Sequence, residues 1–428
     1  MTDMQKYIVI ILLLLCGAVY GQDGTITAHT DSITTIGIKS NLRLDELSRS
    51  GNTTYYVSVY ELSTGDDGIV RTFSINTDET VTLIDSWKFE EVASDIDVVN
   101  VPGSAFVIVG WLDDTNDYNV ASIACSDVGD ITESITETLQ INATSDAAQR
   151  TDLVSVGGGY FGGIYSEGSK GRIASFSCDG SGDLSAVIDD IEYDSYGYFP
   201  SSAYVGGGWI AIGCSGETFD GYLTSVHIDN TDGDITDGSQ LEYLAANTFE
   251  VRVGAWMENV VVTSQSSATY YLGVWSCILD TTDGSLSLIN TENVILKASE
   301  YNKYSSQAFV QGTDSVWVFT TRVGQTGVGD EGGWIFTLNI DPVDGSMYNN
   351  TCIDSVKYRT RVDNTEDIMQ NGGNFTFLST DATPYKYAVY SFSVEGAEQA
   401  SAAQETTNIF GTAISLFGVT GLKLFGIE

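Results

Sequence analysis

The feature that most constrains the fold is a hairpin-like segment that recurs about every 50 residues along the chain. Each copy alternates apolar and polar residues, passes through a turn rich in Asp, Asn and Gly, and then resumes with a second strand. This is the pattern of two antiparallel strands joined by a tight turn. Repetition at this period predicts one repeat architecture rather than several unrelated domains. The copies, of which the first is degenerate, occupy residues 70–81, 121–131, 174–184, 224–235, 274–286, 335–347 and 388–396.

Two further strand-like runs lie between successive hairpins. In the fourth unit they are residues 202–205 and 209–212, which are followed by the hairpin of that unit. Four strands per unit, repeated seven times, is the pattern of a β-propeller, in which each unit forms one blade. The sequence therefore predicts an all-β fold, a seven-bladed β-propeller of four-stranded blades.

The two ends of the repeat complete each other. The last unit supplies only three strands, at residues 367–370, 375–378 and 387–394, whereas residues 24–33 form a spare strand ahead of the first unit. Pairing the spare strand with the last unit would close the ring and remove its exposed sheet edges. We therefore expect the N-terminal strand to complete the last blade.

Both termini carry segments that fall outside the repeat. Lys6, an apolar run to Leu15 and small residues up to Gly21 are typical of a signal peptide. The predicted organisation is a signal peptide at residues 1–21, the propeller at 22–396 and a tail at 397–428, in which a polar spacer precedes an apolar segment. For the tail, a GPI-anchor signal, a segment packed on the propeller, a strand added to a neighbouring subunit and plain disorder all stay open. An extracellular or cell-surface location follows from this organisation.

The chain is strongly acidic, with 18 Lys and Arg residues against 58 Asp and Glu residues and a formal net charge of -40. Such a charge argues against nucleic acid as a partner. We expect an extracellular protein or carbohydrate as partner, with self-assembly or membrane anchoring through the tail as further options. Five cysteines follow the signal peptide without any C-x-x-C spacing. They are predicted to be mostly small buried residues rather than zinc ligands, and one disulfide of unassigned pairing stays open.

The hairpins that follow the pattern hydrophobic-Asp-x-x-Asp-Gly-x-Leu resemble those of the lactonase family of seven-bladed propellers, typified by 6-phosphogluconolactonase. The resemblance extends over nearly the whole mature chain, at the level of the repeat. It implies the propeller fold and, as one functional option, hydrolysis of a sugar derivative at the central channel. It assigns no catalytic residue to this chain, which has only 2 histidines.

Charged residues near the predicted starts of the innermost strands form the candidate ligand face. In a propeller these starts share one face with the loops that join the second and third strands of each blade, so their side chains are expected to surround one mouth of the channel. The basic members either pair with the neighbouring acids or form a patch for an anionic sugar or a carboxylate. The candidates are Asp45, Asp97, Asp152, Glu366, Arg43, Arg150, Arg252, Lys303 and Arg361.

Oxygen-rich loops and glycosylation sequons complete the set of candidate sites. Asp113, Asp114 and Asp117 lie in one loop and could hold Ca²⁺, the only cofactor that the sequence suggests, although their spacing is not that of an EF-hand. Asp-Gly turns elsewhere are interpreted as plain turns, in which Asp bonds its own backbone and Gly takes a positive φ. Sequons for a possible glycoprotein occur at Asn52, Asn142, Asn349 and Asn374.

The sequence carries none of the common catalytic motifs: no G-x-S-x-G, no H-E-x-x-H and no Walker A. Residues 327–332 match G-x-G-x-x-G but lie between two predicted strands, where no helix N-terminus can receive a phosphate. The main interpretation is therefore a secreted or surface-displayed acidic propeller that serves as a non-enzymatic binding or structural module. The alternative is a lactonase-like hydrolase that acts on a sugar derivative at the central channel.

Overall fold

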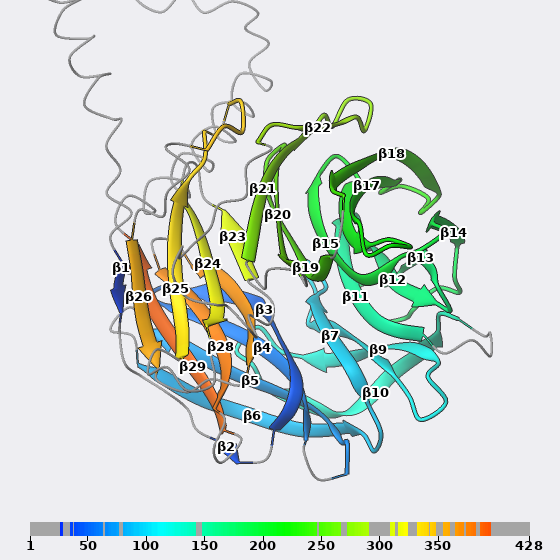
Figure 1. The fold of residues 1–428 in the computed structure, drawn as a ribbon. Coiled ribbons are helices and arrows are strands. Elements are labelled where there is room, and N and C mark those ends of the chain that lie inside the picture. The colour runs from blue at the N-terminus through cyan, green and yellow to red at the C-terminus, as the bar shows by residue number, and fades with distance from the viewer. Residues whose placement is uncertain are drawn as a thin grey trace, which may run out of the picture.

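The fold is all-β, as the sequence predicts, and the described residues form 29 strands in seven antiparallel sheets (Figure 1). Within the described residues, no helix is long and apolar enough to cross a membrane. The predicted signal peptide and the tail lie outside the described part. The computed structural model describes residues 26–28, 35–36, 38–62, 65–76, 80–142, 148–245, 248–266, 272–290, 309–312, 316–323, 332–341, 343–347, 354–359, 364–371, 374–381 and 386–394.

The first four sheets each consist of four strands that are consecutive in the chain. The first contains β3 (Ile38–Ser50), β4 (Thr53–Leu62), β5 (Gly68–Asn76) and β6 (Val81–Glu90). The second contains β7 (Ser94–Asn100), β8 (Phe106–Leu112), β9 (Tyr118–Cys125) and β10 (Ile131–Gln140). The third contains β11 (Ala148–Gly157), β12 (Tyr160–Glu167), β13 (Lys170–Ser177) and β14 (Asp189–Asp194). The fourth contains β15 (Tyr198–Gly206), β16 (Trp209–Ser215), β17 (Gly221–Ile228) and β18 (Ile235–Leu244).

The remaining three sheets continue the series, and the last one also takes in the first strands of the chain. The fifth contains β19 (Thr248–Trp256), β20 (Asn259–Ser266), β21 (Leu272–Leu279) and β22 (Leu286–Leu288). The sixth contains β23 (Phe309–Gly312), β24 (Val316–Val323), β25 (Gly332–Asn339) and β26 (Asp354–Arg359). The seventh contains β27 (Asn364–Asn371), β28 (Asn374–Asp381), β29 (Lys386–Val394), β1 (Ile26–Ala28) and β2 (Thr35–Ile36).

The first strand of each sheet lies innermost, and these strands contact one another in the order β3, β7, β11, β15, β19, β23 and β27. The last of them, β27, contacts β3, so the sheets follow one another as the blades of a propeller (Figure 1). Strand β1 pairs antiparallel with β29, and Ile26, Thr27 and Ala28 lie opposite Val394, Ser393 and Phe392. The pairing that the sequence predicts between the N-terminal strand and the last unit is therefore present.

The hydrophobic core lies between neighbouring blades. The second strands are apolar over most of their length because both of their faces are covered: all seven residues of β16 are buried, for example. The fourth strands are more exposed, as in β10, where a single residue of the ten is buried. Phe161 and Phe176 of the third blade stack on each other at 5.7 Å and pack with Ile108 and Tyr118 of the second blade.

The recurring Asp-Gly turn joins each of the first five blades to its neighbour. Its glycine has a positive φ in five described copies, a conformation that L side chains rarely adopt. The carbonyl oxygen of that glycine accepts a hydrogen bond from a hydroxyl on the third strand of the preceding blade. We call this contact the hydroxyl–glycine bond. The pairs are Thr72 with Gly129, Ser122 with Gly182, Ser175 with Gly233 and Ser225 with Gly284, at 2.5–2.6 Å.

The aspartates that open these turns bond their own backbone, as interpreted from the sequence. Oδ1 of Asp179, of Asp229 and of Asp280 accepts the N–H of the residue two positions further on, at 2.8 Å in each case. Hydrogen bonds from the Ser181 and Thr231 hydroxyls, together with these N–H bonds, lower the pKa of the Asp179 and Asp229 carboxyls. The geometry of the turn backbone thus accounts for Asp and Gly at these positions.

The described cysteines behave as small buried residues, as the sequence predicts. Cys125, Cys178, Cys214 and Cys277 are buried and carry free thiols. Burial raises the pKa of Cys125 and of Cys277 to about 12, which keeps both thiols protonated. Cys352 lies outside the described residues.

Candidate functional site

The start of each inner strand is irregular, and this irregularity positions the site. Pairing with the second strand of the blade shifts register at the same place in six blades, which is the signature of a β-bulge. Bulges twist a strand and re-aim the side chains that follow them. The residues that directly follow these shifts are Arg43, Asp97, Thr151, Ser201, Arg252 and Asp367.

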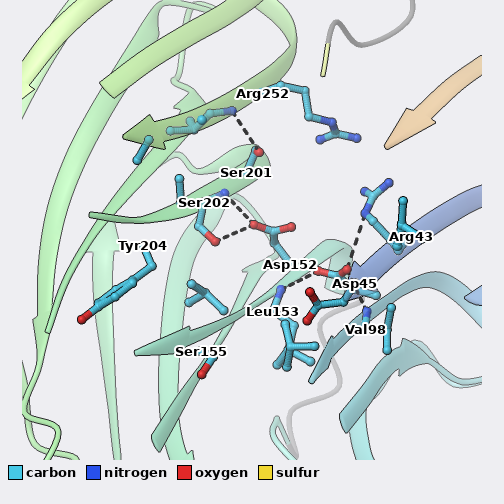
Figure 2. A pocket seen from close by; sticks show the side chains of 18 of the residues that line it. Arg43, Asp45, Val98, Asp152, Leu153, Ser155, Ser201, Ser202, Tyr204 and Arg252 are labelled. Carbon is cyan, nitrogen blue, oxygen red and sulfur yellow. Dashed lines mark hydrogen bonds and ion pairs between the residues drawn. The ribbon is translucent and has the colours of Figure 1, made fainter. Parts of the chain in front are cut away.

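A cavity of about 410 Å³ lies where the inner strands meet, lined chiefly by β3, β7, β11, β15 and β19 (Figure 2). The bulges place charged and hydroxyl side chains from all of these strands around it. The predicted candidates that line the cavity are Arg43, Asp45, Asp97, Asp152 and Arg252. Sequence reasoning missed four polar residues of the lining, namely Ser155, Ser201, Ser202 and Tyr204.

The three cavity carboxylates join neighbouring inner strands. Asp45 Oδ2 accepts the N–H of Asn100 at 2.6 Å, and Asp97 Oδ2 accepts the N–H of Leu153 at 2.7 Å. Asp152 Oδ2 accepts both the N–H and the hydroxyl of Ser202, at 2.5 and 2.6 Å (Figure 2). Each acid therefore bonds the next blade, a structural role that the sequence did not reveal.

The fourth blade uses a hydroxyl where the first three use a carboxylate. Ser201 Oγ accepts the N–H of Val253 on β19 at 3.2 Å (Figure 2). Charge does not mark Ser201, because serine carries no titratable group near neutral pH. Alignment of the repeats does mark it, because the start of β15 corresponds to the starts of β7 and β11.

Two arginines bring positive charge to the same cavity. Arg43 Nε lies 3.7 Å from Asp97 Oδ1, and both side chains are largely buried. Arg43 and Arg252 each donate from Nη1 to the carbonyl of the preceding residue, at 3.1 and 3.2 Å. Pairing with the acidic residues, one of the two options from the sequence, therefore holds for Arg43.

The Asp45 carboxyl has a shifted pKa. Burial raises its pKa from 3.8 to about 6, although the hydrogen bonds from the Asn100 and Glu46 N–H groups act in the opposite direction. A carboxyl that titrates near neutral pH inside a cavity can accept a proton from a ligand or a water molecule there.

Arg150, a further ligand-face candidate, does not line this cavity. Arg150 lines a separate pocket, in which its guanidinium carbon lies 5.1 Å from the centroid of the Phe199 ring. Glu366 lies in β27, at the register shift between Thr365 and Asp367. Lys303 and Arg361 lie outside the described residues.

The predicted calcium loop is built as a turn. Asp113 Oδ1 accepts the Thr115 N–H and hydroxyl and the Asp117 N–H, while Asn119 donates to Asp113 Oδ2 at 3.0 Å. Burial alone would raise the pKa of Asp113, but these hydrogen bonds lower it. Asp114 lies exposed in the same loop. Within the described part of the chain, no group of three or more His, Cys, Asp or Glu residues is placed to hold a metal ion.

The sequons differ in accessibility. Asn52 lies exposed in the turn between β3 and β4. Asn142 does not fit a glycan, because it is 3% exposed and its side-chain oxygen accepts the Tyr118 N–H at 2.5 Å. The backbone of Asn374 begins β28, and Asn349 lies outside the described residues.

Comparison with solved structures shows which known proteins have a similar fold, whereas comparison of sequences finds no match. No protein-family model and no curated protein matches the sequence. The structure is similar to that of a Bacteroides fragilis protein described as a 6-phosphogluconolactonase, with a TM-score of 0.52 and 12% identity over 84% of this chain and 91% of that one. It also matches a periplasmic gluconolactonase from Pseudomonas aeruginosa, with a TM-score of 0.48 and 11% identity over 72% and 83% of the two chains.

The class that the fold defines is the β-propeller. Within it, this chain resembles the lactonase-type propellers, as its hairpin pattern predicts. At 12% identity the likeness is one of fold, so any shared chemistry has to be argued from the cavity itself.

Proposed function

We propose that the chain is a lactonase-like hydrolase and that the central cavity binds the lactone of a sugar acid. The observation that carries the proposal is the cavity lining, in which two arginines and three carboxylates converge and one carboxyl, that of Asp45, has a pKa of about 6. A solved structure of similar fold bears a lactonase name, which favours this activity over a purely structural module. Cavities with a few convergent polar groups and a perturbed carboxyl are the usual form of an active site.

The chemistry requires water, a base and a positive charge. In the proposed reaction the ionised Asp45 carboxylate accepts a proton from water while the water oxygen adds to the lactone carbonyl carbon. The carbonyl oxygen gains the negative charge, which the guanidinium groups of Arg43 and Arg252 stabilise. The ring C–O bond then breaks, and the proton passes from Asp45 to the leaving alkoxide. One water is added and the product is an open sugar acid.

Asp45→Asn tests the proposal. We expect the purified protein to hydrolyse δ-gluconolactone or its 6-phosphate above the spontaneous rate, with kcat/KM rising with pH to a plateau above a midpoint of about 6. The variant lacks the base and should lose about 100-fold or more in kcat. A stopped-flow assay with a pH indicator dye measures both quantities. Unchanged turnover in the variant would exclude Asp45 as the base.

The matched control is Asp189→Asn. The Asp189 carboxylate also bonds the next blade, through the Ile235 N–H at 3.0 Å, but it lies on β14 and does not line the cavity. This variant loses a comparable structural contact and should retain full activity. Equal loss of activity in both variants would trace the effect to blade packing instead of catalysis.

A second function, ligand binding without turnover, is favoured by one observation. All three cavity carboxylates accept backbone hydrogen bonds from the next blade, which holds them as structural groups. In that case the cavity would bind a sugar acid without hydrolysing its lactone. Calorimetry with gluconate in the absence of any lactone turnover would establish this alternative and exclude the hydrolase.

A further inference from the structure

A second pocket, of about 200 Å³, lies beside the central cavity between the second, third and fourth blades. It is formed by the starts of β7, β11 and β15 together with the end of β8 and the loop that follows it. Its lining combines a guanidinium, a carboxylate, an amide and a hydroxyl with two aromatic rings and one aliphatic side chain. The residues are Ser94, Asp95, Leu112, Asn116, Arg150, Tyr198 and Phe199.

The backbone of this pocket is strained in an unusual way. Seven non-glycine residues of the described chain have a positive φ, and four of them line this one pocket: Asp95 (46°), Asn116 (61°), Arg150 (69°) and Phe199 (54°). Asp and Asn tolerate the left-handed region, whereas Arg and Phe adopt it at a cost that Gly would avoid. Phe199 also precedes Pro200, which restricts its backbone further. Non-glycine side chains at strained positions point to a role for those side chains.

Three of the four strained residues occupy the same place in the repeat. Asp95, Arg150 and Phe199 lie within the bulges at the starts of β7, β11 and β15. The bulge geometry explains the positive φ, since it recurs in these three blades. It does not explain why arginine and phenylalanine fill positions at which glycine would cost less.

The lining suits a sugar ring. Arg150 stacks on Phe199 at 5.1 Å, and Tyr198 adjoins it in sequence, so aromatic surface and planar donors lie together. Aromatic faces cover the C–H side of a pyranose, while a carboxylate, an amide and a guanidinium satisfy neighbouring hydroxyl groups with paired hydrogen bonds. Asp95 and Arg150 offset each other in charge, which favours a neutral sugar over an anion.

The two pockets are close enough for one ligand. Asp95 and Asp97 are two residues apart on β7, as are Arg150 and Asp152 on β11, and in each pair the first residue lines the second pocket and the second residue the central cavity. Two residues of strand span about 7 Å, and less across a bulge. This separation matches adjacent rings of a disaccharide.

We propose that the second pocket binds a glycosyl unit of the substrate while the lactone ring occupies the central cavity. The substrate class is then a disaccharide aldonolactone, a sugar-acid lactone that carries a second pyranose. This inference rests on the proposed hydrolase function for the identity of the second ring, but the pocket's affinity for a sugar can be measured separately.

Arg150→Gly and Phe199→Gly test the proposal, because glycine removes the side chain and relieves the positive φ. We expect both variants to melt at or above the wild-type temperature. In the wild type, kcat/KM for cellobionolactone should exceed that for δ-gluconolactone at least tenfold. Each variant should lose that preference and leave gluconolactone turnover unchanged. Met257→Gly is the control, since Met257 has a positive φ of 52° but lies 56% exposed outside both pockets.

Binding of cellobiose, which has no lactone, separates the two hypotheses. NMR titration should detect binding to the wild type and to Asp45→Asn, with a loss of at least tenfold in affinity in Arg150→Gly. Cellobiose binding without any lactone turnover would refute the proposed hydrolase activity and support sugar binding in the second pocket. If both lactones are hydrolysed with equal kcat/KM and cellobiose does not bind, the second pocket is not a sugar site, although the proposed hydrolase activity still holds.

Discussion

At the scale of single residues, Asp45 links the chemistry of the cavity to the stability of the fold. Its pKa is about 6 in the folded protein against 3.8 for a free side chain, so the fold favours the protonated form. The contribution of Asp45 to the free energy of unfolding is therefore greatest below about pH 4 and is lost as pH rises through about 6. The loss should reach about 3 kcal/mol, because each pKa unit corresponds to about 1.4 kcal/mol.

Urea unfolding at several pH values between 4 and 8 measures this effect. Asparagine at position 45 cannot ionise, so the difference in unfolding free energy between wild type and Asp45→Asn should shift in favour of the variant as pH rises. A difference that stays constant over this range would contradict the raised pKa of Asp45.

The buried thiols give a second prediction at this scale. Burial raises the pKa of Cys125 and Cys277 to about 12 and that of Cys178 to about 11, and it also raises the pKa of Cys214. The thiolate is the reactive form, so a disulfide reagent such as DTNB at pH 8 should react with these four residues only after unfolding. Mass spectrometry of the modified peptides identifies the sites. Rapid labelling of any of the four in the native protein would show that its surroundings open.

At the scale of elements, the hydroxyl–glycine bonds explain why the Asp-Gly hairpin repeats. The Ser175 hydroxyl is buried and donates to the carbonyl of Gly233 in the next blade at 2.6 Å. Ser175→Ala removes the donor and leaves that carbonyl without this partner, which should cost about 1–3 kcal/mol in the free energy of unfolding.

Urea unfolding of this variant should be compared with that of Ser134→Ala. Ser134 lies exposed on β10, and its replacement should change the unfolding free energy by less than about 0.5 kcal/mol. Equal stability of the two variants would show that the hydroxyl–glycine bond contributes little to the joining of blades.

The contrast between strands and contacts shows what the sequence can predict. The alternation of apolar and polar residues and the Asp-Gly turns are local features, so the sequence predicts the strands and the blade pattern. The blade pattern in turn predicts the pairing of residues 26–28 with β29, because the last unit lacks a fourth strand. The ring of charged residues was partly predictable for the same reason, since Asp45, Asp97 and Asp152 recur in the repeat. Their bonds to the next blade depend on neighbours about 50 residues away and on bulges that no residue type marks.

Arg150 and Asn142 illustrate the same limit. The sequence predicts Arg150 on the same ligand face as Asp152, but the bulge at the start of β11 turns it into the second pocket. Asn142 matches a sequon, yet its side chain is buried against Tyr118. In both cases the three-dimensional neighbours decide the outcome, and a single sequence does not display them.

At the scale of the whole molecule, the acidic residues serve two different ends. A formal net charge of -40 repels other copies of the chain and limits association. Some of the same carboxylates are drawn into bonds between blades: Asp45, Asp97 and Asp152 near the axis, and Asp85, Glu137 and Asp189 on fourth strands, where each accepts an N–H of the next blade. Some of the acidic residues are thus needed for the hydrogen bonds between blades, and others contribute to the negative charge of the surface.

The pairing of β1 with β29 is the contact on which the seventh blade depends for its outer strand. A chain that begins at residue 29 would lack β1 and leave the outer edge of β29 open at residues 392–394. Each ladder hydrogen bond lost should cost about 1 kcal/mol, and an open edge can pair with another chain. We expect a lower melting temperature and association that grows with protein concentration, measured by calorimetry and light scattering. A chain that begins at residue 24 keeps β1 and serves as the control; if the two chains melt and scatter alike, β1 does not stabilise the ring.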